Sequence, residues 1–183
     1  MAVALTCAVA LLGACSDDEP EAPPTSTASS PSISETTETT PAPTPPSLPP
    51  EATTPDAAGA AAFVRHWFDL VSYAYATGNT EPIRNASTAE CESCNNILET
   101  IEDQYTDGGR IEGGELSVLA AEAPTPVPGQ VALVTTRVSQ AALQGLSADG
   151  EVEMEQAADP GVTSGFFLQP TDTGWLAAGI GEG

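Results

Sequence analysis

The fold of this chain is decided by the run Phe63-Val-Arg-His-Trp-Phe-Asp-Leu-Val-Ser-Tyr-Ala-Tyr75. Its apolar side chains fall on one broad face of an α-helix. The other face carries His66, together with Arg65, Asp69 and Tyr73, and we expect it to be solvated. A helix with so aromatic an apolar face needs a large concave partner. The run therefore predicts a helix packed on a curved sheet.

Capping signals predict three helices. The first is expected to begin at Thr54-Pro55 and to end near Thr77, where Gly78 supplies the left-handed turn. A short second helix is predicted to start at Thr80-Glu-Pro82. Ser87-Thr-Ala-Glu90 has the pattern of a capping box and predicts a third helix, which ends at Asp107-Gly-Gly109.

After Gly109 the hydrophobic period changes to two, which predicts strands. The candidates are residues 115–119, 130–139 and 151–156, and a closing hairpin of 166–168 and 175–177. The second candidate is apolar enough to be covered on both faces. Helices followed by an antiparallel meander define an α+β domain, which we place at residues 56–183.

Four segments carry a resemblance to a known family: Phe63-Val-Arg-His-Trp-Phe-Asp69, Tyr73-Ala-Tyr-Ala-Thr-Gly-Asn-Thr-Glu-Pro82, Cys91-Glu-Ser-Cys94 and Gly108-Gly-Arg-Ile-Glu-Gly-Gly114. With them the chain resembles the actinobacterial lipoproteins that carry domain of unknown function 6318 (DUF6318). The order of helices and strands resembles the cone-shaped NTF2-like (cystatin-like) architecture. The resemblance is good over residues 57–114 and loose over the strands. It implies export, a lipid anchor and a paired-cysteine motif, and it brings no known activity or catalytic residues.

The run Leu12-Gly-Ala-Cys15 resembles the lipobox of bacterial lipoproteins, in which the chain is cut before a lipidated cysteine. Residues 1–14 are therefore predicted to be a signal peptide, and Cys15 is predicted to anchor the chain to the outer face of the cell membrane. The apolar stretch is too short for a spanning helix, which needs about 20 residues. No Lys or Arg precedes it, so we expect the true start codon to lie upstream.

Residues 15–55 are expected to form a disordered linker after the lipidated cysteine, because they are rich in Pro, Thr and Ser and hold almost no large apolar side chains. The whole chain has 4 basic and 26 acidic residues, a net charge of -22. This charge argues against nucleic acid as a partner, since phosphates require basic surfaces.

Cys91 and Cys94 are the only cysteines in the predicted domain, and in an exported chain such a pair predicts a disulfide. A thiol–disulfide exchange site is the alternative. Glu90 and Glu92 oppose it, because neighbouring carboxylates raise the pKa of a thiol. No third ligand accompanies the pair, so we expect no metal site.

The leading functional hypothesis is a non-enzymatic domain that binds an envelope partner or a small apolar ligand in a pocket between helix and sheet, with Trp67 and Tyr75 as candidate lining residues. We predict no catalytic residues and no cofactor. His66 with Asp69 could form an acid–base group, but the predicted phase places both on the solvated face. Glu151, Glu153 and Glu155 are likewise expected to be solvated.

Two alternatives remain: an enzyme that uses the same pocket, and an envelope thiol–disulfide protein. A carboxylate pointing into the pocket would favour the enzyme. The positions predicted to face inward hold Val, Leu, Thr and Met.

Overall fold

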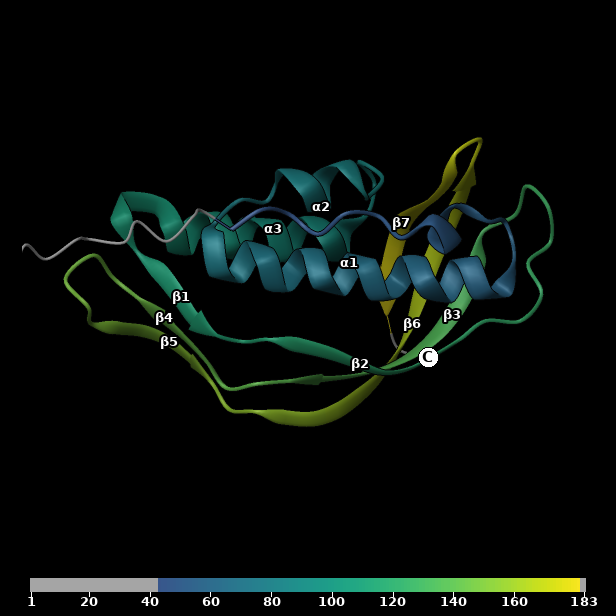
Figure 1. The fold of residues 1–183 in the computed structure, drawn as a ribbon. Coiled ribbons are helices and arrows are strands. Elements are labelled where there is room, and N and C mark those ends of the chain that lie inside the picture. The colour runs from purple at the N-terminus through teal and green to yellow at the C-terminus, as the bar shows by residue number, and fades with distance from the viewer. Residues whose placement is uncertain (1–42, 182–183) are drawn as a thin grey trace, which may run out of the picture. The chain divides into compact units, whose positions relative to one another are not determined.

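The computed structural model describes residues 43–181, so the predicted signal peptide, Cys15 and most of the predicted linker lie outside the described residues. Helical elements come first: η1 (Pro50–Thr53), α1 (Ala57–Thr77), α2 (Glu81–Asn85), α3 (Glu92–Tyr105) and η2 (Thr106–Gly108). The strands follow: β1 (Arg110–Gly113), β2 (Leu116–Glu122), β3 (Ala132–Gln140), β4 (Leu143–Leu146), β5 (Val152–Gln156), β6 (Asp159–Thr171) and β7 (Gly174–Gly181). The α+β class is confirmed, with helices packed on antiparallel sheets (Figure 1).

The ends of α1 show one correction and one confirmation. Asp56, not Thr54, caps the start, and its Oδ1 accepts a hydrogen bond from the Gly59 N–H at 2.7 Å. Thr54 cannot cap because it stands two residues before the cap position, and its hydroxyl donates to the Glu51 carbonyl at 2.8 Å. Gly78 closes the helix as predicted, with a φ of 73° that disfavours residues with a side chain.

The third helix also begins later than the capping box predicts. Its cap is Cys91, whose Sγ accepts a hydrogen bond from the Cys94 N–H at 3.2 Å. Ser87 is engaged elsewhere, because it forms a parallel bridge with Ala177 of β7.

The strands form two sheets where one curved sheet was expected. The order is β1-β4-β5 in the first and β2-β3-β6-β7 in the second. The connections β1–β2, β3–β4 and β5–β6 lie side by side at the junction of the two sheets. In the smaller sheet, the last residue of β1, Gly113, pairs with the first residue of β4, Leu143. In the larger sheet, the last residue of β3, Gln140, pairs with the first residue of β6, Asp159. Gly113 and Gly114 have φ values of 76° and 80°, so the chain bends sharply there. The two sheets therefore continue one another around a bend (Figure 1).

The helices cover one face of the larger sheet, and the opposite face is open (Figure 1). Along β3, burial alternates strictly: Val134 is fully buried, whereas Leu133 is 41% exposed. The prediction that this strand is covered on both faces is therefore wrong. Its apolar run resembles that of a doubly covered strand, but no second layer exists among the described residues.

The core lies between α1 and the larger sheet. Trp67 and Phe68 meet Phe166 of β6 edge to face, with ring centroids 5.1 and 5.7 Å from that of Phe166. This aromatic cluster confirms the predicted apolar face of the helix.

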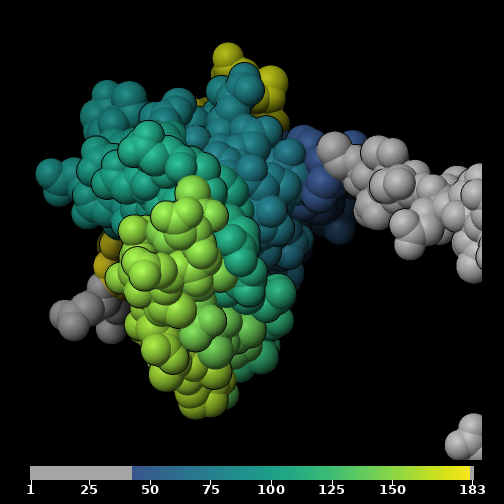
Figure 2. Space-filling model, turned by 90° about the vertical axis from the view of Figure 1, so that its left-hand side faces the viewer, coloured from purple at the N-terminus to yellow at the C-terminus, as the bar shows by residue number. Residues whose placement is uncertain are grey.

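Two of the sheet edges, β7 and β5, are protected in different ways. On the outer edge of β7, Ala177 exchanges main-chain hydrogen bonds with Ala86 and Thr88 at 2.9 and 2.7 Å. Farther along, the Ile180 N–H donates to Ser93 Oγ at 2.7 Å. The outer strand of the smaller sheet, β5, instead carries the exposed carboxylates predicted from its sequence, Glu153 and Glu155. The β4–β5 hairpin forms the yellow-green surface in Figure 2.

Candidate functional site

A cavity of about 300 Å³ lies between α1 and the larger sheet; we call it the core cavity. The helix contributes Trp67, Phe68, Val71 and Tyr75, and the strands contribute aliphatic and polar side chains in equal number. The structure thus places both candidate lining residues, Trp67 and Tyr75, on one cavity. Its volume is at the lower end of the range of small-molecule pockets, about 300–1,000 Å³.

One end of the core cavity is polar. Gln140 ends β3 and Gln156 ends β5, and the Gln156 Nε2 donates to the Gln140 Oε1 at 3.3 Å. The Gln140 Nε2 is buried and forms no hydrogen bond of regular length and angle, although the Gln140 side chain interacts with the Tyr75 phenol. A register shift between Val138 and Gln140 helps to bring this amide to the cavity.

Tyr75 and Asp159 complete this polar end. Burial raises the pKa of the Tyr75 phenol, and the Gln140 side chain partly offsets this rise, so the hydroxyl remains protonated at neutral pH. Asp159 accepts a hydrogen bond on Oδ1 from the Gly161 N–H at 2.7 Å. The prediction that the inward positions hold only Val, Leu, Thr and Met is therefore wrong.

The sequence did not predict that Gln140 and Asp159 line the core cavity, for one reason. Both stand at strand ends next to the bend, where strict alternation of inward and outward positions fails. Polar residues at the ends of apolar strands could have indicated such lining residues, but the same pattern is also typical of an ordinary loop.

The predicted disulfide is present: Cys91 and Cys94 are bonded, and neither side chain is exposed to solvent. The bond closes the first turn of α3. Between the two cysteines, Ser93 Oγ receives the Ile180 N–H, so this turn also holds the edge of β7. Burial of both cysteines disfavours thiol–disulfide exchange, which requires an accessible sulfur.

The predicted environment of His66 is wrong. Its side chain is only 6% exposed, because residues 43–49 and α2 cover that side of α1. Burial lowers the pKa of the imidazole, and Asp69 partly offsets this. Arg65 does not pair with Asp69; its Nη1 donates to the Val118 carbonyl at 3.1 Å.

A second cavity, of about 630 Å³, lies beside His66; we call it the strap groove. Its floor comes from α1 (Phe63, His66 and Leu70), and its walls come from α2 and the β6–β7 hairpin. Residues 43–49, which we call the strap, run along α1 and form the remaining wall (Figure 1).

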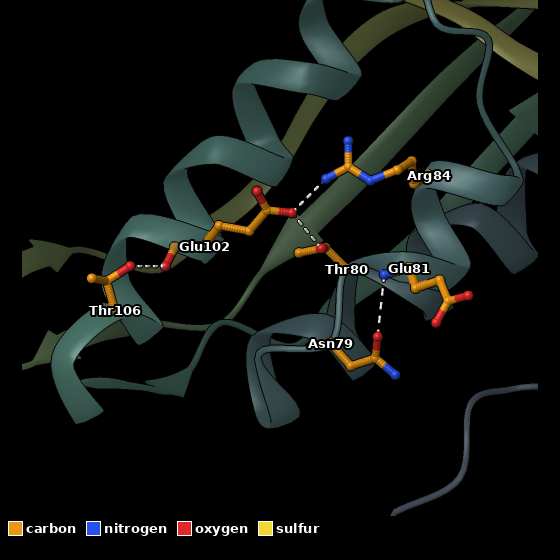
Figure 3. A network of polar contacts seen from close by, with 6 residues as sticks. All are labelled: Asn79, Thr80, Glu81, Arg84, Glu102 and Thr106. Carbon is orange, nitrogen blue, oxygen red and sulfur yellow. Dashed lines mark hydrogen bonds and ion pairs between the residues drawn. The ribbon is translucent and has the colours of Figure 1, made fainter.

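A polar network joins α2 to α3 (Figure 3). Glu102 of α3 accepts hydrogen bonds on Oε1 from Arg84 Nη2 and from Thr80 Oγ1, each at 2.5 Å. Arg84 and Glu102 are half exposed, whereas Thr80 is buried. The network is therefore a clamp between helices, with one buried member.

Within residues 43–181, no cluster of His, Cys, Asp or Glu could hold a metal ion. None of the helices in that range is both long and apolar enough to cross a membrane.

These observations define an α+β domain with a small cavity between its long helix and its sheet. The chain belongs to the family of unknown function DUF6318, whose model matches residues 33–178. No curated protein matches it. Among solved structures, the crystal structure of the intermembrane space region of chloroplast protein ARC6 matches with a TM-score of 0.49 and 17% identity, covering 70% of this chain and 98% of that chain.

Proposed function

We propose that the chain is an exported lipoprotein, anchored to the outer face of the cell membrane through Cys15, whose NTF2-like domain binds a small, mainly apolar molecule in the core cavity without catalysis. The observation that carries the proposal is the Gln140 Nε2, a buried donor that forms no hydrogen bond of regular geometry and lies on the wall of a mainly apolar cavity. Leaving such a group unpaired costs about 1–3 kcal/mol. A ligand that accepts this hydrogen bond recovers that free energy.

The polar end of the cavity also restricts the ligand. The Tyr75 hydroxyl and the Gln140 amide offer hydrogen-bond donors, whereas Asp159 and the net charge of -22 repel anions. The fitting ligand is therefore uncharged, with an apolar body and a carbonyl or hydroxyl oxygen at one end.

The experiment uses Nile red, an uncharged apolar dye whose fluorescence rises in apolar sites. Val162 lines the core cavity and is 53% exposed, so Val162→Trp should obstruct the cavity from its rim without disturbing the core. Val152→Trp is the matched control, because Val152 is 52% exposed and lies away from the cavity. We expect Val162→Trp to weaken dye binding about tenfold, or about 1.4 kcal/mol. Equal binding by both variants contradicts the proposal.

The hydrogen-bond argument needs its own variant. Gln140→Leu removes the unpaired donor and keeps a side chain of similar size. We expect it to weaken binding of an uncharged ketone of matched shape more than binding of the corresponding hydrocarbon. If both probes are affected equally, Gln140 fills space and does not select the ligand.

Asp159 supports a second candidate, an enzyme, because it brings a carboxylate to the cavity. One of its oxygens is engaged by Gly161, which leaves the other for proton transfer. The test incubates the protein with neutral lipids extracted from cell envelopes and follows them by mass spectrometry. A product that wild type forms and Asp159→Asn does not form would favour the enzyme over the binding domain.

A further inference from the structure

The strap meets the domain with the periodicity of a polyproline helix. Pro46 and Pro49, three residues apart, are half buried, whereas the other strap residues are exposed. Pro49 has φ -62° and ψ 141°, the dihedral angles of polyproline II. That conformation has three residues per turn and no internal hydrogen bonds. Of the two half-buried prolines, Pro46 lines the strap groove, together with Pro45 and Leu48.

The groove has the features that bind such a helix. Phe63 and Trp175 contribute aromatic rings, and Pro82 adds an apolar wall. Directly after the strap and η1, the Trp175 Nε1 donates to the carbonyl of Thr54 at 2.9 Å. Aromatic walls, together with donors to main-chain carbonyls, are the recurring means of recognising proline-rich segments.

The strap is held only lightly. The described hydrogen bonds include none between residues 43–48 and the rest of the domain. By contrast, Ala52 in η1 is fully buried and belongs to the core. The strap can therefore leave the groove while η1 stays in place.

The groove also contains a polar side chain without a hydrogen-bond partner among the described residues. His66 is only 6% exposed and lines the strap groove, and its side chain forms no hydrogen bond with any described residue. A neutral imidazole offers one donor and one acceptor. The free carbonyls of a proline-rich chain are suitable partners for its N–H.

Charge sets a further condition. The strap, Pro43-Thr-Pro-Pro-Ser-Leu-Pro49, contains no acidic residue, and Glu81 lies on the wall of the groove. An acidic segment would be repelled by this carboxylate and by the acid excess of the chain.

We propose that the strap groove is a recognition site for proline-rich segments without acidic residues, that residues 43–49 occupy it within the same chain, and that such a segment from another polypeptide can replace them. The proposal is independent of the core cavity. A tethered strap competes at an effective concentration of about a millimolar. The intact chain therefore admits only a segment that binds well or is abundant.

The test uses the full chain and a labelled peptide of residues 43–50. Changing Pro46, Leu48 and Pro49 together to Ser removes the anchors of the strap and leaves the core intact. We expect this opened variant to bind the peptide at least about tenfold more tightly than wild type does, because its own strap no longer competes. If the triple variant does not fold, Leu48→Ser alone serves, since Leu48 is 42% exposed.

Matched peptides test the register. Substituting Ser at the two half-buried positions, Pro46 and Pro49, should weaken binding about tenfold or more, whereas Ser at Pro43, which is exposed and does not line the groove, should change it less than about threefold. His66 is the only histidine, so its ring NMR signals report on the groove without ambiguity. We expect them to shift as the peptide saturates. A folded opened variant that binds no peptide, or equal effects of the two substituted peptides, would overturn the proposal.

Discussion

The indole Nε1 of Trp67 donates a hydrogen bond to Ser87 Oγ at 3.0 Å. This contact joins the middle of α1 to the short segment that closes the edge of β7. Ser87 Oγ in turn donates to the Ile83 carbonyl at 2.8 Å. One fully buried tryptophan is therefore part of both the aromatic core and the connection between α2 and the sheet.

Trp67→Ala should lower the free energy of unfolding by about 3–5 kcal/mol, because it leaves a cavity beneath α1. Ser87→Ala should cost less, about 1–3 kcal/mol, since it only removes the acceptor of a buried N–H. Urea unfolding of both variants gives these values. A silent Trp67→Ala would show that the packing of α1 is misassigned.

Acid should destabilise the domain partly through His66. Burial lowers the pKa of His66 in the folded state, so below about pH 6.5 the unfolded chain binds more protons and stability falls with falling pH. His66→Gln removes this contribution. We expect the difference in unfolding free energy between pH 7.5 and pH 5.5 to be smaller in the variant than in wild type. An equal difference would mean that carboxylates alone cause the acid sensitivity.

Reduction of the disulfide should weaken the domain without unfolding it. The bond closes a very short loop, for which the chain-entropy estimate is about 2 kcal/mol. We expect the Tm to fall on reduction, and the reaction to be slow under native conditions because both cysteines are fully buried. Rapid reduction by a thiol reductant, with catalysis of disulfide exchange in a second protein, would support the redox alternative instead.

The residues of the clamp in Figure 3 should contribute unequally to the free energy of unfolding. Arg84→Ala removes a half-exposed ion pair, worth about 0–1 kcal/mol. Glu102→Ala should cost more, about 1–3 kcal/mol, because it also removes the hydrogen-bond acceptor of the buried Thr80 hydroxyl. Thermal unfolding at low and high salt separates the two, since only the ion pair is screened. Equal losses in both variants would mean that Thr80 finds another acceptor.

Cys15→Ala should release the protein from the membrane fraction. Each buried methylene of an acyl chain contributes about 0.8 kcal/mol, and two chains give stable anchoring. Fractionation followed by a salt wash measures the effect. Ser16→Ala is the control next to it, and it should stay in the membrane fraction. A Cys15→Ala variant that resists the wash contradicts the lipid anchor.

The sequence predicts well wherever one interaction dominates. The phase of α1 follows from its large apolar residues, and Gly78 ends the helix because few other residues adopt its backbone conformation. The hairpin at Asp172-Thr-Gly174 follows from turn chemistry and is present between β6 and β7. Each of these features depends on residues close together in the chain.

The wrong predictions concern features that depend on residues far apart in the chain. His66 has a polar side chain at the border of the apolar face, and it is buried only because a segment about 20 residues upstream folds back over it. Gln140 and Asp159 meet at the core cavity only because two strands bend at the same level. Local patterns carry no information about such distant coverage, so this part of the candidate site required the structure.

The hydrogen bonds that cover the outer edge of β7 affect how copies of the chain would behave when crowded together. Proteins held on a membrane by lipid share a thin layer, where a free strand would meet its copies repeatedly and could template cross-molecule sheets. Here Ala86, Thr88 and Ser93 occupy the N–H and carbonyl of Ala177 and the N–H of Ile180, groups of β7 that a neighbouring strand would use. The β5 edge is guarded only by the charge of Glu153 and Glu155. Of these two edges, β5 is therefore the one at which crowded copies of the chain should first associate, and salt that screens its carboxylates should promote this association.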